Sequence, residues 1–476
     1  MKQILLAFLF LHAVSVKAQV YYKEIETAEP VWKVIAVNHY DHHVVIANMH
    51  DVDEVKTGAK ISKFDLDGNE LNSEVISIDD HEFMIMGAES YQDMIICNGL
   101  IRHVDSVDFD HYTFLMDENF NTTAVSRFSS EYDDPWYYSS ILVNEDYIFI
   151  GGSYEKDLPP LVPIAFFMRY DHDLNLQIYK ELTNESVFLW ELEGFIGENM
   201  FRVSTGCLLD SGSEKLTLDF SLNPIDTVLI PNVFTYFLNT EILSDTTVLI
   251  SGKYSRFQSD SSLSALQLVD NDMNVIKFHP IHDQKSDYIE PCYRSAISRI
   301  DQSSFYHCSN SNMIQAILYG QNTWLKITKL DTDLNEDWQY YYGGDRFYWS
   351  NFFLPTLDSC LLVAGVTEET PPYGVNGKAF LLKLDPDSLT TGITKRYFDN
   401  ENITVYPNPG KDFFFIKSDL KLKELRLISI EGRVVLHHRI NELYNVDVSV
   451  LPSGTYLYQI FGEEGLLECG KWMKSD

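Results

Sequence analysis

The chain has 476 residues, of which 45% are hydrophobic and 13% aromatic. This composition excludes a disordered chain and is sufficient for a large buried core. With 70 acidic and 36 basic residues, the formal net charge is −34, which disfavours binding to nucleic acid and to anionic lipid. The acidic excess indicates a soluble surface, with cation binding as the alternative.

Residues 1–18 have the pattern of a secretory signal peptide. Lys2 gives a short positive region, and Ile4–Val16 is almost entirely apolar. Val16–Ala18 then places small residues at the cleavage positions before Gln19. The apolar run is too short for a membrane-spanning helix. The sequence therefore predicts Sec export and no transmembrane segment.

Six cysteines follow, and none of them forms a C-x-x-C motif. Zinc sites and thioredoxin-like redox sites therefore lack support. Cys292 and Cys308 flank a predicted hairpin, so a disulfide between them is one interpretation in an oxidising compartment. The alternative is that the cysteines in apolar runs are small buried hydrophobic residues.

One pattern recurs along residues 20–399: apolar alternation that ends in a turn rich in Asp and Asn. Trp324–Asn335 is a clear copy. Such runs are rich in strand-forming residues, and the Asp and Asn side chains favour a tight turn. The spacings of the aligned aspartates range from 48 to 61 residues, with a mean near 53. The seven aligned aspartates are Asp65, Asp117, Asp171, Asp219, Asp270, Asp331 and Asp385.

A second pattern, a short apolar run that ends in Gly or another small residue, precedes each turn. Clear cases are Asp146–Gly152, Asp245–Gly252 and Asp358–Gly365. Four strands fit in each repeat, so the sequence predicts an all-β fold and a seven-bladed β-propeller of the longer, kelch-like period. Either Val20–Glu26 or Thr391–Phe398 would supply the outer strand of the last blade.

The clearest repeat also carries a resemblance to a known family. Trp338–Gly344, Asp358–Gly365 and Gly377–Asp385 are similar to the secreted propeller repeat that is common in Bacteroidota. The resemblance implies a Bacteroidota-like source for the chain.

The composition changes at 399–402, and about seven short strands are predicted beyond it. This spacing is typical of a small β-sandwich. Val405–Pro409, Gly432–Val434, Val448–Tyr456 and Gly470–Lys474 follow one another there. In these residues the segment 402–476 resembles the type A C-terminal sorting domain of the type IX secretion system.

That resemblance implies an Ig-like fold, recognition by the type IX secretion machinery after Sec export, and often removal of the tail by a sortase-like peptidase that anchors the cargo to surface lipopolysaccharide. The sorting-signal residues that it implies are Tyr406, Pro407, Asn408, Pro409, Gly432, Gly454, Tyr456 and Lys471.

The turns at Asp65, Asp171 and Asp331 resemble the start of a calcium loop. A calcium loop needs Glu at its twelfth position, and none of the three has it. The hairpin interpretation is therefore favoured. Zinc-protease, G-x-S-x-G, P-loop and dinucleotide motifs do not occur in the sequence. We expect no metal, no cofactor and no catalytic residue that the sequence can identify.

Two clusters of aromatic and acidic residues, Glu131–Tyr138 and Asp345–Trp349, lie between an outer strand and the next inner strand. In a propeller these connections lie on one face near the central channel. Aromatic rings beside carboxylates suit sugar binding, and packing between blades is the alternative. The candidate ligand-binding residues are Asp133, Asp134, Trp136, Tyr137, Tyr348 and Trp349.

The sequence thus predicts a secreted or cell-surface protein whose propeller is a binding or adhesion module for glycan or protein. One alternative is a glycan hydrolase or lyase with acid/base carboxylates around the channel. Another is a structural component of the surface coat.

Overall fold

The computed structural model describes residues 19–475 except 51–56, 107, 130–133, 157–161, 183–186, 197–198, 208–212, 231–235, 245–246, 256–261, 271, 284–285, 287, 370, 372–375, 392–402, 419–421, 430–432, 441–444 and 462–465. The predicted signal peptide lies outside these residues. The chain divides into two compact units, Met1–Gly392 and Ile393–Asp476. The all-β prediction is confirmed, since the described residues form 36 strands and two short helices. Neither helix of the described part is long and apolar enough to cross a membrane.

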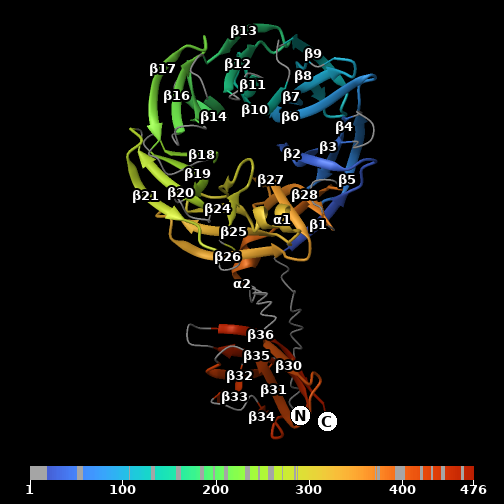
Figure 1. Cartoon of the computed structure of the whole chain (residues 1–476), viewed down its shortest axis with the longest axis vertical. Coiled ribbons are helices and arrows are strands. Elements are labelled where there is room, and N and C mark those ends of the chain that lie inside the picture. Colours follow the sequence, from blue (N-terminus) through green and yellow to red (C-terminus); the bar gives the residue numbers. More distant parts are fainter. Residues whose placement is uncertain are drawn as a thin grey trace, which may run out of the picture. The chain divides into compact units, whose positions relative to one another are not determined.

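The described residues of the first unit form seven separate antiparallel sheets, which Figure 1 shows around a common centre. The first three sheets comprise β2 (Val31–His39), β3 (His42–His50), β4 (Thr57–Asp65) and β5 (Glu70–Ile76); β6 (His81–Tyr91), β7 (Met94–His103), β8 (Asp110–Asp117) and β9 (Thr122–Ser129); and β10 (Asp134–Val143), β11 (Ile148–Lys156), β12 (Val162–Tyr170) and β13 (Leu176–Glu181).

The next two sheets comprise β14 (Val187–Ile196), β15 (Met200–Cys207), β16 (Ser213–Asp219) and β17 (Pro224–Ile230); and β18 (Tyr236–Ser244), β19 (Thr247–Ser255), β20 (Ser262–Asp270) and β21 (Val275–Pro280). The last two comprise β22 (Ile289–Pro291), β23 (Ile297–Ser298), β24 (Ser304–Ser311), β25 (Trp324–Asp331) and β26 (Glu336–Gly343); and β27 (Phe347–Pro355), β28 (Leu361–Glu368), β29 (Lys378–Leu384) and β1 (Gln19–Ile25). Helix α1 (Met313–Tyr319) interrupts the connection from β24 to β25.

The Asp/Asn turns close the hairpin between the third and the outer strand of six sheets. At Asp331, Oδ1 accepts hydrogen bonds from the N–H groups of Asp333 (2.9 Å) and Asn335 (2.8 Å), and Asn335 Nδ2 donates to Oδ2. These bonds hold the pKa of the Asp331 carboxyl below its ordinary value. Leu334 adopts a left-handed conformation, with φ of 56°, and its fully buried side chain offsets a cost of about 1 kcal/mol. The hairpin prediction is confirmed, because N–H groups of the turn itself donate hydrogen bonds to this carboxylate.

The seventh copy of the pattern was wrongly expected to be an equivalent hairpin. Asp385 Oδ1 instead accepts from the N–H groups of Asp387 (3.0 Å) and Ser388 (3.4 Å) and caps helix α2 (Pro386–Thr391). Proline suits the first position of a helix because it has no N–H to leave unpaired there. The outer place beside β29 is taken by β1. Of the two alternatives for the last sheet, the structure therefore shows the N-terminal strand.

The small residues of the second pattern allow inner strands to approach closely. A Cβ atom on Gly99 would lie 1.9 Å from the carbonyl oxygen of Met84, and one on Gly365 would lie 2.1 Å from that of Trp349. Such distances leave no space for any side chain, so the sequence pattern follows from the spacing between the two innermost strands of a sheet.

Polar side chains on second strands join neighbouring sheets. Asn48 on β3 bonds both backbone groups of Ile85 on β6, donating to the carbonyl oxygen (2.8 Å) and accepting from the N–H (2.8 Å). Similar bonds join Asn98 to Ser139, Ser153 to Leu189, and Asn310 to Ser350. These bonds satisfy buried polar groups and fix how adjacent sheets align.

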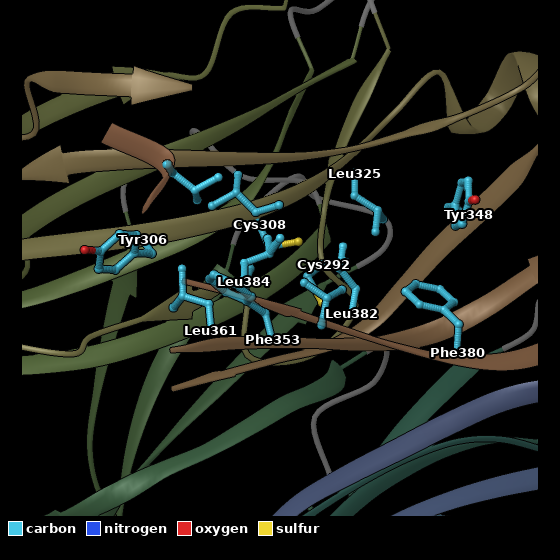
Figure 2. Packing of buried hydrophobic residues seen from close by; sticks show 14 residues of the cluster. Cys292, Tyr306, Cys308, Leu325, Tyr348, Phe353, Leu361, Phe380, Leu382 and Leu384 are labelled. Carbon is cyan, nitrogen blue, oxygen red and sulfur yellow. The ribbon is translucent and has the colours of Figure 1, made fainter. Parts of the chain in front are cut away.

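Buried hydrophobic residues fill the space between adjacent sheets. Figure 2 shows the cluster between the last two sheets, where Leu325, Phe353 and Phe380 pack together. Cys292 and Cys308 lie side by side in it, with the Cys292 N–H donating to the Cys308 carbonyl oxygen at 2.9 Å. Both are buried free thiols in this structure, which corresponds to the interpretation as small buried residues. The structure therefore does not show the disulfide that was one interpretation of the sequence.

The second unit contains two sheets around one core, with the number of strands that the sequence predicts. One sheet comprises β30 (Ile403–Tyr406), β31 (Phe413–Ser418) and β34 (Asn445–Asp447); the other comprises β33 (Val434–Arg439), β32 (Glu424–Ser429), β35 (Gly454–Phe461) and β36 (Leu466–Lys474). Their shared core includes Phe414 from the first sheet and Leu427, Ile460 and Trp472 from the second.

The Pro-Asn-Pro segment of this unit is joined to its last strand. Trp472 is fully buried, and its indole Nε1 donates to the carbonyl oxygen of Pro407 at 2.8 Å. The Asn408 amide donates to the carbonyl oxygen of Lys471 (2.8 Å) and accepts from the N–H of Met473 (2.9 Å). Hydrogen bonds thus join the first and the last segment of the sorting-domain pattern, which are distant in sequence.

The remaining residues of the predicted sorting signal have different positions. The Tyr456 hydroxyl donates to the carbonyl oxygen of Pro452 at 2.6 Å, and its ring packs near Trp472. Pro409 is exposed, and so is Gly454, where a Cβ atom would meet nothing within 4 Å. Gly432 lies outside the described residues.

Candidate functional site

The innermost strands of the seven sheets face the centre of the first unit, and Figure 1 labels β2, β6, β10, β14, β18 and β27 there. The predicted ligand-binding residues were expected in the connections before two of these strands, but the described ones lie within the strands themselves. Asp133 lies outside the described residues, whereas Asp134, Trp136 and Tyr137 lie in β10, where the structure describes the strand without their side chains.

Tyr348 and Trp349, on β27, differ in their surroundings. Tyr348 is buried, and its ring makes edge contacts with Tyr22, Tyr342 and Phe380. Burial raises the pKa of its hydroxyl. Packing between sheets therefore accounts for Tyr348. Trp349 is half-buried, and its centroid lies 5.9 Å from that of Tyr293 in an edge-to-face contact.

A lysine that the sequence analysis missed lies next to this aromatic pair. Lys33 on β2 is only 4% exposed. Its Nζ atom is 3.5 Å from the carbonyl oxygen of Met86 and lies 5.5 Å and 5.9 Å from the ring centroids of Tyr293 and Trp32. No carboxylate among the described residues pairs with it. Burial, and then the neighbouring Arg294, hold its pKa well below the ordinary value.

Arg294 is held beside Lys33 by backbone contacts between the last sheets. Its N–H donates to the carbonyl oxygen of Asn351 at 2.8 Å, and its backbone pairs with that of Phe352. The Asn351 side chain in turn accepts from the N–H of Val34 at 2.9 Å. Three sheets thus fix the positions of these two cations.

Two glutamates on β14, Glu191 and Glu193, are acidic counterparts to the cations Lys33 and Arg294. Glu193 forms a buried ion pair with Lys215, with 2.9 Å between Oε2 and Nζ, and accepts a hydrogen bond from the Ser204 hydroxyl. Glu191 Oε2 accepts from the N–H (3.0 Å) and the hydroxyl (3.2 Å) of Thr240 on β18.

The two cations and the two glutamates interact electrostatically through Arg294. Its charge lowers the pKa of both Lys33 and Glu191. Burial, and then the neighbouring Glu193, raise the pKa of the Glu191 carboxyl to about 7, against the opposing effects of Thr240 and Arg294. The carboxyl is therefore partly protonated at neutral pH. We use the name central cluster for Trp32, Lys33, Glu191, Glu193, Lys215, Tyr293, Arg294 and Trp349.

β-Bulges occur in the inner strands next to residues of the central cluster. A bulge adds one residue to a strand and redirects the side chains beside it. Lys33 and Glu191 each come directly after such a shift in register. Shifts also occur between Ile85 and Gly87 and between Ser350 and Phe352. Within the described residues, no three His, Cys, Asp or Glu side chains come close enough to hold a metal ion.

Glu191 is expected to make stability depend on pH. The folded protein holds its proton up to pH about 7, whereas an unfolded chain loses it near pH about 4.3. The free energy of unfolding therefore falls as pH rises through this window. Glu191→Gln removes this contribution, so we expect the variant to match the parent near pH about 4 and to exceed it by about 1–3 kcal/mol at pH about 8. Denaturant unfolding across this range tests it, and parallel curves for the two proteins would contradict it.

The chain has distant likenesses to solved structures. Pyrococcus horikoshii acylaminoacyl peptidase has 9% identity and a TM-score of 0.42, with 91% of this chain covered. This chain spans 58% of that peptidase. The phage phi92 endosialidase has 9% identity and a TM-score of 0.44, with 96% of this chain and 79% of that chain covered. TM-scores this low support no argument about fold or activity. A comparison with curated protein sequences gives no match.

The tail gives a specific match. Residues 404–471 match the family described as a secretion system C-terminal sorting domain. These residues include the Pro-Asn-Pro segment and most of the last strand, which the structure joins by hydrogen bonds. The second unit therefore contains a secretion-system sorting domain, and this supports export of the protein to the cell surface or its secretion.

Proposed function

We propose that the protein is a cargo of a type IX-like secretion system in a Bacteroidota-like bacterium, and that residues 20–399 form a seven-bladed β-propeller that binds a glycan or a protein. Residues 1–18 would direct Sec export, and an Ig-like domain at 402–476 would direct passage across the outer membrane. The arrangement of the sheets supports the propeller. Each sheet contacts the next, and β2 of the first contacts β27 to β29 of the last.

The central cluster is the observation that carries the binding function. Buried charges cost stability unless they are paired, and no carboxylate in the described part of the chain pairs with the buried Lys33. The half-buried rings of Trp32 and Tyr293 flank it, and Trp349 contacts the Tyr293 ring. Charged groups and aromatic rings that converge at the inner ends of several sheets are typical of a ligand site. Aromatic faces and polar groups together favour a glycan.

Trp349→Ala is expected to weaken glycan retention by about tenfold or more, because it removes a ring next to the ligand. The measurement is binding of the purified full-length protein to a glycan array. Trp338→Ala is the matched control, since Trp338 is a half-buried tryptophan on the outer strand β26. Thermal unfolding of both variants separates loss of binding from loss of fold.

Unchanged retention by Trp349→Ala, or equal losses in the two variants, would contradict the proposed site. Turnover of an offered glycan that Glu191→Gln abolishes would instead support the hydrolase or lyase alternative, because a carboxyl with a pKa of about 7 suits acid/base catalysis.

A further inference from the structure

We propose that Lys33 and Arg294 bind the carboxylate of a sugar, so that the ligand of the central cluster is a glycan that ends in one carboxylated pyranose. This inference rests on the proposed binding function and specifies its ligand. The carboxylated sugar is either a terminal uronate or a terminal sialate, since both carry the carboxylate that the two cations would bind.

The first argument is a comparison of the buried lysines. Among the described residues, Lys33, Lys215, Lys326 and Lys383 are buried. Lys215 pairs with Glu193, and Lys383 pairs with Asp358 at 2.5 Å.

Lys326 donates to the carbonyl oxygen of His282, and two carboxylates, Asp283 and Glu336, raise its pKa against the effect of burial. Among the described residues, the charged group that acts on Lys33 is the like charge of Arg294. Burial beside a second cation disfavours the charged form of this amine in the free protein. An anion bound between the two groups would stabilise the charged form.

The second argument concerns the groups around the two cations. Among the described residues, the Lys33 amine has only two weak acceptors, the carbonyl oxygen of Met86 at 3.5 Å and its Sδ atom at 4.0 Å. Tyr293 and Trp32, whose rings flank it, are half-buried, as is Arg294. A carboxylate that reached this point would gain two charge-assisted bonds. The apolar face of its pyranose ring would then lie against aromatic side chains.

The third argument concerns the net charge. At −34, the protein repels dense polyanions at long range. A single carboxylate at the end of an otherwise neutral glycan meets little of this repulsion. The surface charge and the buried cations together therefore favour one terminal acidic sugar over an acidic polymer.

Binding should also change protonation. Burial and Arg294 depress the pKa of Lys33 in the free protein, and a carboxylate next to an amine favours its charged form. Met86, Tyr293 and Trp32 are the other groups that contact the amine. A carboxylated sugar should therefore bind with uptake of protons, and a neutral sugar should bind without it.

The test uses isothermal titration of the full-length protein in buffers of different ionisation enthalpy. The probes are sialyllactose with lactose, and a glucuronate-terminated disaccharide with its carboxyl-reduced form. We expect each acidic sugar to bind about 10- to 100-fold more tightly than its neutral counterpart, as for a hydrogen bond to a charged group. Lys33→Met should abolish both this preference and the proton uptake. Lys277→Met, on the outer strand β21, removes the same charge far from the cluster and should leave both unchanged.

Acidic and neutral sugars that bind equally to the parent would overturn the inference and leave the proposed function standing. Retained preference in Lys33→Met would overturn it as well. Failure of the parent to bind any sugar would contradict the inference together with the glycan form of the proposed function. The preference and the proton uptake of the parent protein need no variant, so the test does not depend on the folding of Lys33→Met.

Discussion

Lys215→Met is expected to lower the free energy of unfolding by about 3–5 kcal/mol, because it leaves the Glu193 carboxylate buried without its cation. The two side chains are 2% and 0% exposed and lie 2.9 Å apart. Of its partners among the described residues, the Ser204 hydroxyl would then remain bonded to the carboxylate. Denaturant unfolding of the full-length protein at neutral pH measures the loss.

The control is the double variant Lys215→Met with Glu193→Leu, which removes both charges. Replacing a buried ion pair by apolar residues is often close to neutral, so we expect it to recover most of the lost stability. A double variant as unstable as the single one would mean that packing, and not the unpaired charge, causes the effect. Lys33→Met should behave differently from Lys215→Met, because no carboxylate among the described residues loses a partner.

Trp472→Ala is expected to destabilise the second unit by about 3–5 kcal/mol, a large fraction of the stability of a small domain. The fully buried indole packs against Phe414 and Tyr456. Its removal also leaves the Pro407 carbonyl oxygen without its indole donor. Calorimetry of the full-length protein should show that the transition of the second unit is lost or shifted down while that of the first remains.

Met473→Ala is the matched control for this variant, because Met473 is next to Trp472 in sequence and is 40% exposed. This substitution should change the free energy of unfolding by less than about 0.5 kcal/mol. In cells that carry the export system, we expect Trp472→Ala to accumulate in the periplasm and Met473→Ala to reach the surface. Normal surface export of a Trp472→Ala protein whose second unit is unfolded would mean that the folded tail is not what the machinery recognises.

The strands and hairpins could be predicted from the sequence because their causes are local. Each Asp/Asn turn is stabilised by bonds within five consecutive residues, as at Asp331–Asn335. The seventh copy was mispredicted because its outcome depends on distant residues. In the sheet that contains β29, the position of the outer strand is taken by β1, which comes from the other end of the unit. Helix α1 was also missed, although the spacing of 61 residues from Asp270 to Asp331 indicated an insertion.

The candidate site was less predictable for a related reason. Alternation along a strand shows which residues share a face, but it does not show which faces of different sheets meet. Lys33 stands out in the sequence only as one cation within the apolar run Val31–Val37. Its relation to Arg294 and Glu191 arises from three different sheets. The aromatic cluster at Asp345–Trp349 was expected in a connection between strands, whereas Tyr348 and Trp349 lie in β27 itself. The sequence also could not separate the buried Tyr348 from the half-buried Trp349.

The pairing of β1 with β29 also constrains how the first unit is completed. Tyr22 pairs with Leu382 in this register, so residues from opposite ends of the unit must meet before its last sheet has four strands. Until Leu384 is available, β1 lacks the strand with which it pairs. Contacts of such large sequence separation form slowly, and unpaired edges invite association with other chains. A chain truncated before β29 would therefore leave β1, at the other end of the unit, with an unpaired edge.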